Sequence, residues 1–345
     1  MSTVSRAIAR WSRRILVALT ILIVLIVGAL AVSRGLVASR ETGVPPERVR
    51  LYVAVDGENV STSLGAVFVQ RRGPRGGVPV VLIHGAGAWS GFWTDVAEAL
   101  ARSGFHAVAI DLPPFGKSSA DQAGRYARRD QAQRIHDVLA TLKLERAIIV
   151  GHSFGAGPVV ETALRHGERL RGMVLVNAAL GLPTDGAVPV APPAALQWLL
   201  GQPMLVESIV AATATNPMLT NQLVRAMMHR KDAADDQQVA ILRYPLYMKG
   251  ATAGFSRWLP NLLLTDGGGL SAAPDRYRTL RMPTAILWGN RDTVTPLAQG
   301  ERLRTLIEGS TLTIIDEVGH IPHIEDPKGF LEALRKALDA LSVRG

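Results

Sequence analysis

Cysteine is absent from this chain of 345 residues. Its absence excludes disulfide bonds, catalysis by a thiolate, and zinc or iron–sulfur sites built from cysteine. Charged residues are also sparse, at 19%, whereas apolar residues make up 48% of the chain. A chain of this length and apolar content buries a large core, which excludes wholesale disorder and accommodates one catalytic domain with an insertion.

Negative charge is scarce at the N-terminus. The formal net charge is +9, and the first 50 residues hold eight arginines against only Glu41 and Glu47. Eight minus two leaves +6 in this segment and +3 for the other 295 residues. Because the basic charge is concentrated at the N-terminus, the remainder carries no electrostatic footprint of nucleic-acid binding, and we expect no nucleic-acid partner.

Residues 15–32 form a run of 18 residues without a charge. As a helix rising about 1.5 Å per residue the run spans about 27 Å, close to the bilayer core of about 30 Å. Four arginines precede it. The positive-inside rule therefore predicts a basic tail over 1–14 in the cytoplasm, a membrane-spanning signal anchor over 15–32, and a catalytic domain on the extracytoplasmic side.

A cleaved signal peptide is the alternative to an anchor. Ala29-Leu30-Ala31 is a small-x-small sequence of the kind that is cut after export, which would give a secreted or periplasmic protein. The uninterrupted length of the apolar run favours the anchor. Residues 33–50 carry Pro45-Pro46 and mixed charge, and we expect them to form a tether.

Beyond residue 50, apolar runs of strand length alternate with helical stretches. Strands are predicted at 51–55, 64–70, 78–84, 106–111, 146–151, 173–177, 284–289 and 311–316, and helices at 93–102, 131–142, 156–166, 296–307 and 328–341. The later strands are continuous apolar runs, as a sheet buried on both faces requires. The pattern predicts an α/β fold with a mostly parallel eight-stranded sheet flanked by helices.

The alternation stops between residues 183 and 275. That segment has helical apolar spacing, many leucines and methionines, and a Gly267-Gly268-Gly269 break. We interpret it as a helical cap inserted between two parts of the core, 51–182 and 276–345.

Ser153 is the candidate nucleophile. Gly151-His152-Ser153-Phe154-Gly155 is a G-x-S-x-G sequence between a predicted strand and a predicted helix, and that context gives the motif meaning. A serine on such a turn projects its Oγ at the N-terminus of a helix, whose dipole favours developing negative charge. A chance glycine-rich turn is the alternative, and the flanking strand and helix disfavour it.

A serine hydroxyl needs a base, and His320 is the best placed of eight histidines. It follows the last predicted strand, and the glycine before it permits a tight loop. His323 is its rival. His84 and His152 flank glycines at strand ends, and we interpret both as histidines that pack loops.

The base in turn needs an acid that holds its tautomer. Asp292 lies in the loop after the penultimate predicted strand; its alternative role is that of an ordinary loop or helix-capping aspartate. Some related architectures place the acid after the preceding strand, but here that strand ends in Asn177, which is neutral. Asp111 ends an earlier strand and is expected to fix its own loop.

In these pieces the chain resembles the α/β-hydrolase fold family over residues 51–343. The matching segments are HG at 84–85, DLPPFGKS at 111–118, GHSFG at 151–155, WGNRDTVTP at 288–296 and VGHIPHIEDP at 318–327. The order Ser153, Asp292, His320 is also that of the family. The resemblance implies an oxyanion hole formed by the backbone N–H groups of Phe154 and Ala86, each contributing about 3 kcal/mol to transition-state binding.

The resemblance implies acyl transfer to water through an acyl-enzyme, with a small ester-like substrate and with no cofactor or metal required. The apolar and aromatic residues of the cap suggest an apolar acyl or alcohol group; the alternative is that these residues pack the cap itself. Carbon–carbon bond hydrolases and cofactor-free haloperoxidase-like enzymes of this fold also use a serine and remain open. Dehalogenases and epoxide hydrolases use an aspartate at the position of Ser153, which argues against both. A catalytically idle, membrane-tethered binding module is the alternative from another class.

Overall fold

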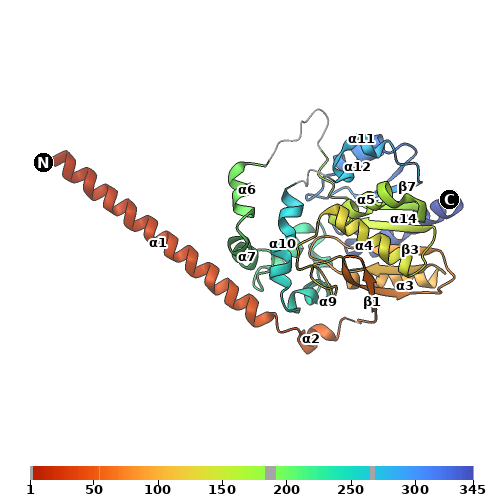
Figure 1. Cartoon of the computed structure of the whole chain (residues 1–345), viewed down its shortest axis with the longest axis horizontal. Coiled ribbons are helices and arrows are strands. Elements are labelled where there is room, and N and C mark those ends of the chain that lie inside the picture. The colour runs from red at the N-terminus through yellow and green to blue at the C-terminus, as the bar shows by residue number, and fades with distance from the viewer. Residues whose placement is uncertain (1–2, 54, 183–191, 265–268, 345) are drawn as a thin grey trace.

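A mixed sheet of eight strands forms the centre of the computed structural model, which describes residues 3–53, 55–182, 192–264 and 269–344 (Figure 1). The strands are β1 (Glu58–Thr62), β2 (Gly65–Arg72), β3 (Pro79–Ile83), β4 (His106–Ile110), β5 (Ala147–His152), β6 (Leu170–Val176), β7 (Thr284–Gly289) and β8 (Thr311–Ile315). Their order across the sheet is β1-β2-β4-β3-β5-β6-β7-β8. The β1–β2 and β2–β4 pairs are antiparallel and the other pairs are parallel. The predicted fold class is confirmed.

The first predicted strand is wrong. Leu51 and Tyr52 form a turn after the short helix α2 (Glu47–Arg50), and the first strand is β1 instead; residue 54 lies outside the described residues. β1 has the polar sequence ENVST, and of its side chains only that of Val60 is buried. It pairs with β2 at the edge of the sheet, where a strand does not need apolar residues on both faces. A search for continuous apolar runs therefore misses it.

Helices cover both faces of the sheet. On one face, α4 (Arg128–Thr141), α5 (Ala156–His166) and α12 (Leu297–Leu306) pack their apolar side chains against the strands. On the other face lie α3 (Thr94–Arg102) and α14 (Pro327–Arg344). The central strands β4, β5 and β7 are buried along their whole length, which explains their uninterrupted apolar sequences.

The described part of segment 183–275 is helical. It contains α6 (Ala194–Leu200), α7 (Pro203–Ala212), α8 (Thr220–Met227), α9 (Asp236–Arg243) and α10 (Ala251–Leu263), with 3-10 turns η4 (Lys231–Ala233), η5 (Tyr244–Tyr247) and η6 (Leu270–Ala272). The short helices α11 (Pro274–Tyr277) and α13 (Pro322–Glu325) and the 3-10 turns η1 (Ser90–Trp93), η2 (Ser153–Gly155) and η3 (Gly167–Arg169) complete the fold. Residues 183–191 and the glycines 267 and 268 of the predicted break lie outside the described residues.

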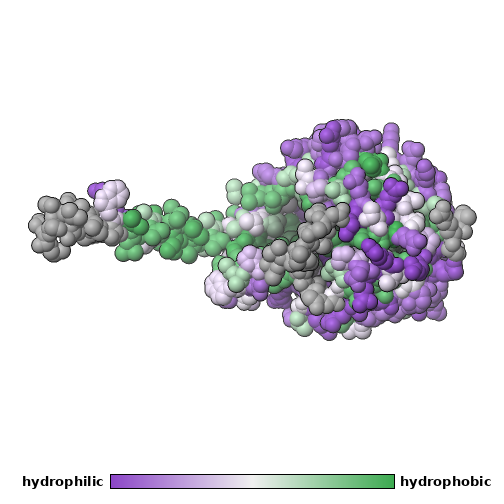
Figure 2. Space-filling view, turned by 90° about the horizontal axis from the view of Figure 1, so that it is seen from above, coloured by the Kyte–Doolittle hydropathy of each residue, from purple (hydrophilic) through white to green (hydrophobic). Residues whose placement is uncertain are grey.

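A single long helix, α1 (Thr3–Arg40), projects away from the rest of the molecule (Figure 1). Its stretch Arg14–Arg40 is the one helix in the described chain that is long and apolar enough to cross a membrane, and most of its apolar side chains up to Val32 stand free of the body (Figure 2). By length and composition it fits both a membrane anchor and a signal sequence.

The helix continues beyond residue 32 into the segment expected to be a tether. Residues 33–40 are helical and pack on the cap helix α7, with Ser33, Val37 and Arg40 buried. The Arg40 guanidinium donates hydrogen bonds to the carbonyls of Leu246 (2.9 Å) and Thr215 (2.6 Å). The end of α1 is therefore fixed to α7 and to the residues Thr215 and Leu246.

Candidate active site

The predicted site residues follow strands whose carboxyl ends meet at one edge of the sheet. Ser153 follows β5, Asp292 lies in the loop after β7, and His320 lies beyond β8. The strands β3, β5, β6, β7 and β8 are parallel neighbours, so the loops that follow them gather at the same edge. Ligands of open α/β sheets bind at this edge.

Ser153 occupies a strained turn between β5 and α5. Its φ angle is +50°, a left-handed conformation that is uncommon for a residue other than glycine. The turn is possible because Gly155 lets the start of α5 approach the β3 loop: a Cβ there would lie 2.5 Å from the His84 carbonyl oxygen. The strain directs the Ser153 side chain out of the sheet, toward the loop that carries His320.

Ser153, His320 and Asp292 form a continuous hydrogen-bonded chain. The His320 Nε2 atom lies 2.8 Å from Ser153 Oγ, and His320 Nδ1 lies 2.8 Å from Asp292 Oδ2. All three side chains are buried. With a charged Asp292 as acceptor, Nδ1 carries the proton and Nε2 presents a lone pair to the serine hydroxyl.

Asp292 is surrounded by hydrogen-bond donors. Besides His320, the Asn177 amide (2.5 Å) and the Thr295 hydroxyl (2.6 Å) donate to Oδ2, while the backbone N–H groups of Val294 (2.7 Å) and Thr295 (2.9 Å) donate to Oδ1. Burial alone would raise the pKa of Asp292, but the hydrogen bonds from His320, Asn177 and Thr295 outweigh it and hold the pKa below its ordinary value. The carboxylate therefore stays charged at neutral pH.

Asn177 and Thr295 were missed as members of the site. Because it is neutral, Asn177 cannot serve as the acid. Its position at the end of β6 instead lets its amide donate a hydrogen bond to the Asp292 carboxylate. Its carbonyl oxygen also lies 3.2 Å from Thr295 Oγ1. The Asp-x-x-Thr spacing of Asp292 and Thr295 is a local signal for this turn; for Asn177 the only signal is its place at the same sheet edge.

Glu325 is a third residue that the sequence does not point to, and it fixes the loop of His320. Its Oε2 accepts hydrogen bonds from the backbone N–H groups of Gly319 (2.9 Å) and His229 (2.8 Å), and its Oε1 accepts from Ile321 (3.0 Å). The residues on both sides of His320 are thus attached to one buried carboxylate. The same carboxylate links this loop to the cap segment after α8.

The other histidines do not join this chain. His323 is buried between Phe92 and Trp93, with its ring centroid 4.4 Å from that of Trp93, and neither ring nitrogen has a hydrogen-bond partner among the described residues. His84 Nε2 accepts from the Leu112 N–H (2.9 Å), and His152 Nε2 donates to the His320 carbonyl (2.8 Å). Both hold loops of the site.

Burial keeps these three histidines neutral. It lowers the pKa of His84 to about 4 and, together with the charge of His320, that of His152 to about 3. It also lowers the pKa of His323 well below the ordinary value. Of these histidines, His320 is the one that is hydrogen-bonded to both a hydroxyl and a carboxylate.

The two predicted oxyanion donors flank Ser153. Phe154 follows it at the start of η2, where the first amides of a helix have no acceptor within the helix. Ala86 is exposed in the loop after β3. A Cβ on Gly85 would lie 3.2 Å from the Ser153 Cβ, so this loop passes directly beside the serine.

Aromatic side chains surround the same place. The Phe154 ring packs edge-to-face on Trp258 of α10, with ring centroids 4.9 Å apart, and Trp258 packs on Phe115 (5.0 Å) and Phe255 (5.2 Å). A Cβ on Gly87 would lie 3.5 Å from the Phe255 ring. Helix α10 therefore covers Phe154 and the loop after β3 with apolar surface.

Asp111 fixes the loop after β4, as expected. Its carboxylate accepts from the N–H groups of Ser90 (2.5 Å) and Lys117 (2.7 Å) and is fully buried. Burial raises the pKa of Asp111 to about 6. It makes no hydrogen bond to His320 among the residues described.

Sequence comparison places the chain in a known class. The model of the alpha/beta hydrolase fold family matches residues 78–327, and the chain belongs to this family. The protein is thus an α/β-hydrolase.

Its relatives include enzymes with different substrates. The 2-hydroxy-6-oxo-2,4-heptadienoate hydrolase of Pseudomonas putida is 28% identical over 271 residues, covering 76% of this chain and 90% of that protein. Lipase 3 of a Moraxella species is 25% identical over 276 residues, covering 75% and 79%. A solved membrane phospholipase A from a bacterium aligns with a TM-score of 0.66 and 23% identity, covering 96% and 99%.

Proposed function

We propose that this α/β-hydrolase cleaves a carboxylic ester with an apolar acyl or alcohol group, with Ser153 as nucleophile, His320 as base and Asp292 as acid. The observation that carries the proposal is the hydrogen-bonded chain from Ser153 Oγ through His320 to Asp292, which begins at a serine held at positive φ. The apolar rings at Phe154 and the 25% identity to a lipase support an ester of apolar character.

In the first half of the proposed reaction, His320 Nε2 takes the Ser153 proton while Oγ forms a bond to the ester carbonyl carbon. The carbonyl oxygen becomes an oxyanion, which the N–H groups of Phe154 and Ala86 stabilise. The carbon–oxygen bond to the leaving alcohol then breaks, and the alcohol leaves with the proton from His320. An acyl group remains on Ser153.

In the second half, His320 removes a proton from water, and the resulting hydroxide attacks the acyl carbon. Ser153 leaves as the alkoxide and regains its proton from His320, which frees the acid product. Asp292 stays charged throughout and stabilises the imidazolium. The donors around Asp292 support this role, because they keep its pKa low.

Carbon–carbon bond hydrolysis is the second candidate, and the 28% identity to a 2-hydroxy-6-oxo-2,4-heptadienoate hydrolase favours it. A direct comparison of kcat/KM for p-nitrophenyl esters of increasing chain length and for 2-hydroxy-6-oxo-dienoates separates the two. We expect the esters to be turned over and the rate to rise with acyl length. Turnover confined to the dienoates would overturn ester hydrolysis as the activity.

Labelling by a fluorophosphonate tests the nucleophile itself. The full-length protein should gain one covalent adduct on the peptide that contains Ser153, and Ser153→Ala should gain none. An unlabelled but folded wild-type protein would instead point to an idle binding module.

We also propose that α1 is an uncleaved anchor, with residues 1–14 in the cytoplasm and the hydrolase domain outside. The charge asymmetry around the apolar run supports this orientation. Deleting residues 1–32 should release an active soluble enzyme, because residues 33–41 keep their contacts with the cap. Protease added to spheroplasts should digest the domain. Full protection would overturn the orientation, and a soluble exported chain that begins near Ser33 would identify a cleaved signal peptide.

A further inference from the structure

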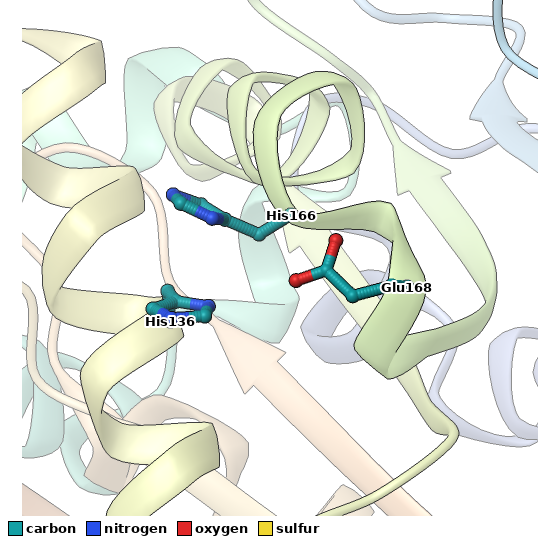
Figure 3. A group of neighbouring side chains, drawn as sticks. All are labelled: His136, His166 and Glu168. Atoms are coloured by element: carbon teal, nitrogen blue, oxygen red, sulfur yellow. The ribbon is translucent and has the colours of Figure 1, made fainter.

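Two histidines and a glutamate meet at the end of α5 that is remote from Ser153 (Figure 3). His136 projects from α4, His166 is the last residue of α5, and Glu168 lies in η3. The imidazole rings face each other with centroids 4.0 Å apart and planes inclined by 25°. One potential ligand atom from each residue lies within 4.8 Å of the other two.

The polar atoms of this cluster are poorly satisfied by the protein. His136 Nδ1 is buried from solvent and has no hydrogen-bond partner among the described residues. Within the same part of the chain, the exposed Glu168 carboxylate forms neither an ion pair nor a hydrogen bond. A buried ring nitrogen without a partner destabilises the folded state, so a ligand that satisfied it would be favoured.

The charges near His166 suit the binding of a cation. A neutral imidazole has a free lone pair, which a metal ion requires. Of the charged neighbours, Glu168 and Asp137 carry negative charge, and the positive Arg165 is hydrogen-bonded to Glu161 (2.5 Å).

We propose that His136, His166 and Glu168 bind a divalent transition-metal ion, with Zn²⁺ as the best match. Two imidazoles and one carboxylate form a donor set that suits Zn²⁺, whereas Mg²⁺ and Ca²⁺ prefer oxygen donors alone. The fourth position falls to water, since Glu168 is exposed. The cluster contains no residue of the proposed catalytic chain.

The geometry requires a small convergence of the side chains. Zinc bonds of about 2.0–2.1 Å put tetrahedral donors about 3.4 Å apart, compared with distances of up to 4.8 Å here. Because lone pairs lie in the ring planes, the two rings must also open from their stacked arrangement. Both histidines are only partly buried and Glu168 is exposed, so rotations of these side chains suffice.

The bound ion joins three elements of the scaffold and takes no part in the acyl transfer. It links α4 to the end of α5 and to η3, while Ser153 lies before the other end of α5. The 11 residues of this helix separate the two places by about 16 Å. An ion that binds the folded state alone stabilises it by mass action. Metal binding should therefore raise the melting temperature.

Calorimetric titration of the full-length, tag-free protein in detergent with ZnCl₂ tests this site. We expect one saturable equivalent of Zn²⁺ and a higher melting temperature. His136→Gln and His166→Gln should each weaken the affinity by at least about tenfold, a loss that even outer-shell changes produce. His229→Gln is the matched control, because His229 is a part-exposed histidine 3.4 Å from a carboxylate oxygen of Glu317. It should bind Zn²⁺ as the wild type does.

Titration with Co²⁺ provides a second readout that does not depend on heat or activity. The wild type should develop the visible absorption bands of a four-coordinate ion, and His166→Gln should not. Unchanged Zn²⁺ affinity in folded His136→Gln and His166→Gln, or the absence of saturable binding to the wild type, would overturn the proposal and leave the stacked rings as packing alone. Ser153→Ala should lose ester hydrolysis and still bind Zn²⁺, which would show that the metal site does not depend on the proposed catalytic residues.

Discussion

The two ends of helix α5 carry two histidine–carboxylate clusters in opposite states. Before its first turn, His320 lies 2.8 Å from both Ser153 and Asp292, and the carboxylate has donors on both oxygens. Beyond its last turn, His136 and His166 are stacked without a shared hydrogen bond, and a buried ring nitrogen has no partner in the described structure. Both clusters place histidine close to a carboxylate. Only the cluster before the first turn of α5 is ordered by hydrogen bonds.

The difference fits the two roles that we propose for the clusters. Acyl transfer depends on groups that are in place before the reaction, because reorganisation during the reaction raises the barrier. Backbone donors, Asn177, Thr295 and Glu325 supply that order around Asp292 and His320. A metal ion supplies its own order when it binds, so its ligands need only be close and deprotonated.

Replacing Ser153 should have the largest effect and should affect one end of α5 only. Ser153→Ala removes the nucleophile, and we expect kcat for ester hydrolysis to fall on the order of 10⁶-fold. The melting temperature should change little, since alanine keeps the same backbone conformation. Steady-state kinetics and a thermal scan check this; near-wild-type turnover by a folded variant would mean that another residue attacks the substrate.

Asp292→Asn should cost on the order of 10⁴-fold in kcat, because an amide holds the wrong tautomer of His320. Asp316→Asn is the matched control in the next loop, where Asp316 accepts a hydrogen bond from the Asn290 amide (2.9 Å). It should keep most of the activity. An active Asp292→Asn together with an inactive Asp316 or Glu317 variant would move the acid to that loop.

Glu325→Gln tests whether the positioning of the His320 loop by Glu325 affects kcat for ester hydrolysis. The amide NH₂ group faces backbone donors, so the loop should shift and kcat should fall by about 10²-fold, as expected for a misplacement of about 1 Å. KM should change little. Asp326→Asn, which alters a residue that accepts from Gly329 N–H (3.1 Å), is the control. Equal kcat in both variants would show that Glu325 stabilises the fold without positioning His320.

Lowering the pH should decrease the stability of the folded protein through its buried histidines. His84, His152 and His323 have lowered folded-state pKa values, so the unfolded chain binds more protons below about pH 6.5 and stability falls as the pH decreases. Each histidine contributes at most about 1.4 kcal/mol per pH unit. Asp111, with its pKa raised to about 6, acts in the opposite sense and offsets part of this loss between pH 6 and 4.

His323→Phe removes one of these titrating groups and retains a ring between Phe92 and Trp93. It should therefore keep ester hydrolysis within a few-fold and flatten the decrease in melting temperature between pH 7 and 5. His320→Ala should lose the activity instead. An inactive, folded His323→Phe with an active His320→Ala would exchange the two histidines.

Local sequence was enough for most of the fold and for the predicted triad residues. Apolar runs of strand length identify the central strands because a sheet covered on both faces needs apolar residues throughout. A glycine-flanked serine between strand and helix, and a histidine and an aspartate after late strands, are also local signals. The polar strand β1 has no such signal, because pairing at the edge rather than burial holds it in place.

The sequence by itself determined the α/β class and the long apolar N-terminal helix, and it predicted Ser153, Asp292 and His320 as the residues of the proposed triad. Only the tertiary structure decided which groups surround them. Asn177 and Glu325 act through hydrogen bonds to residues on other strands and loops, and His136 meets His166 because α4 packs against α5. Such contacts join residues far apart along the chain, and they depend on the packing of whole elements, which no local pattern of residue types records.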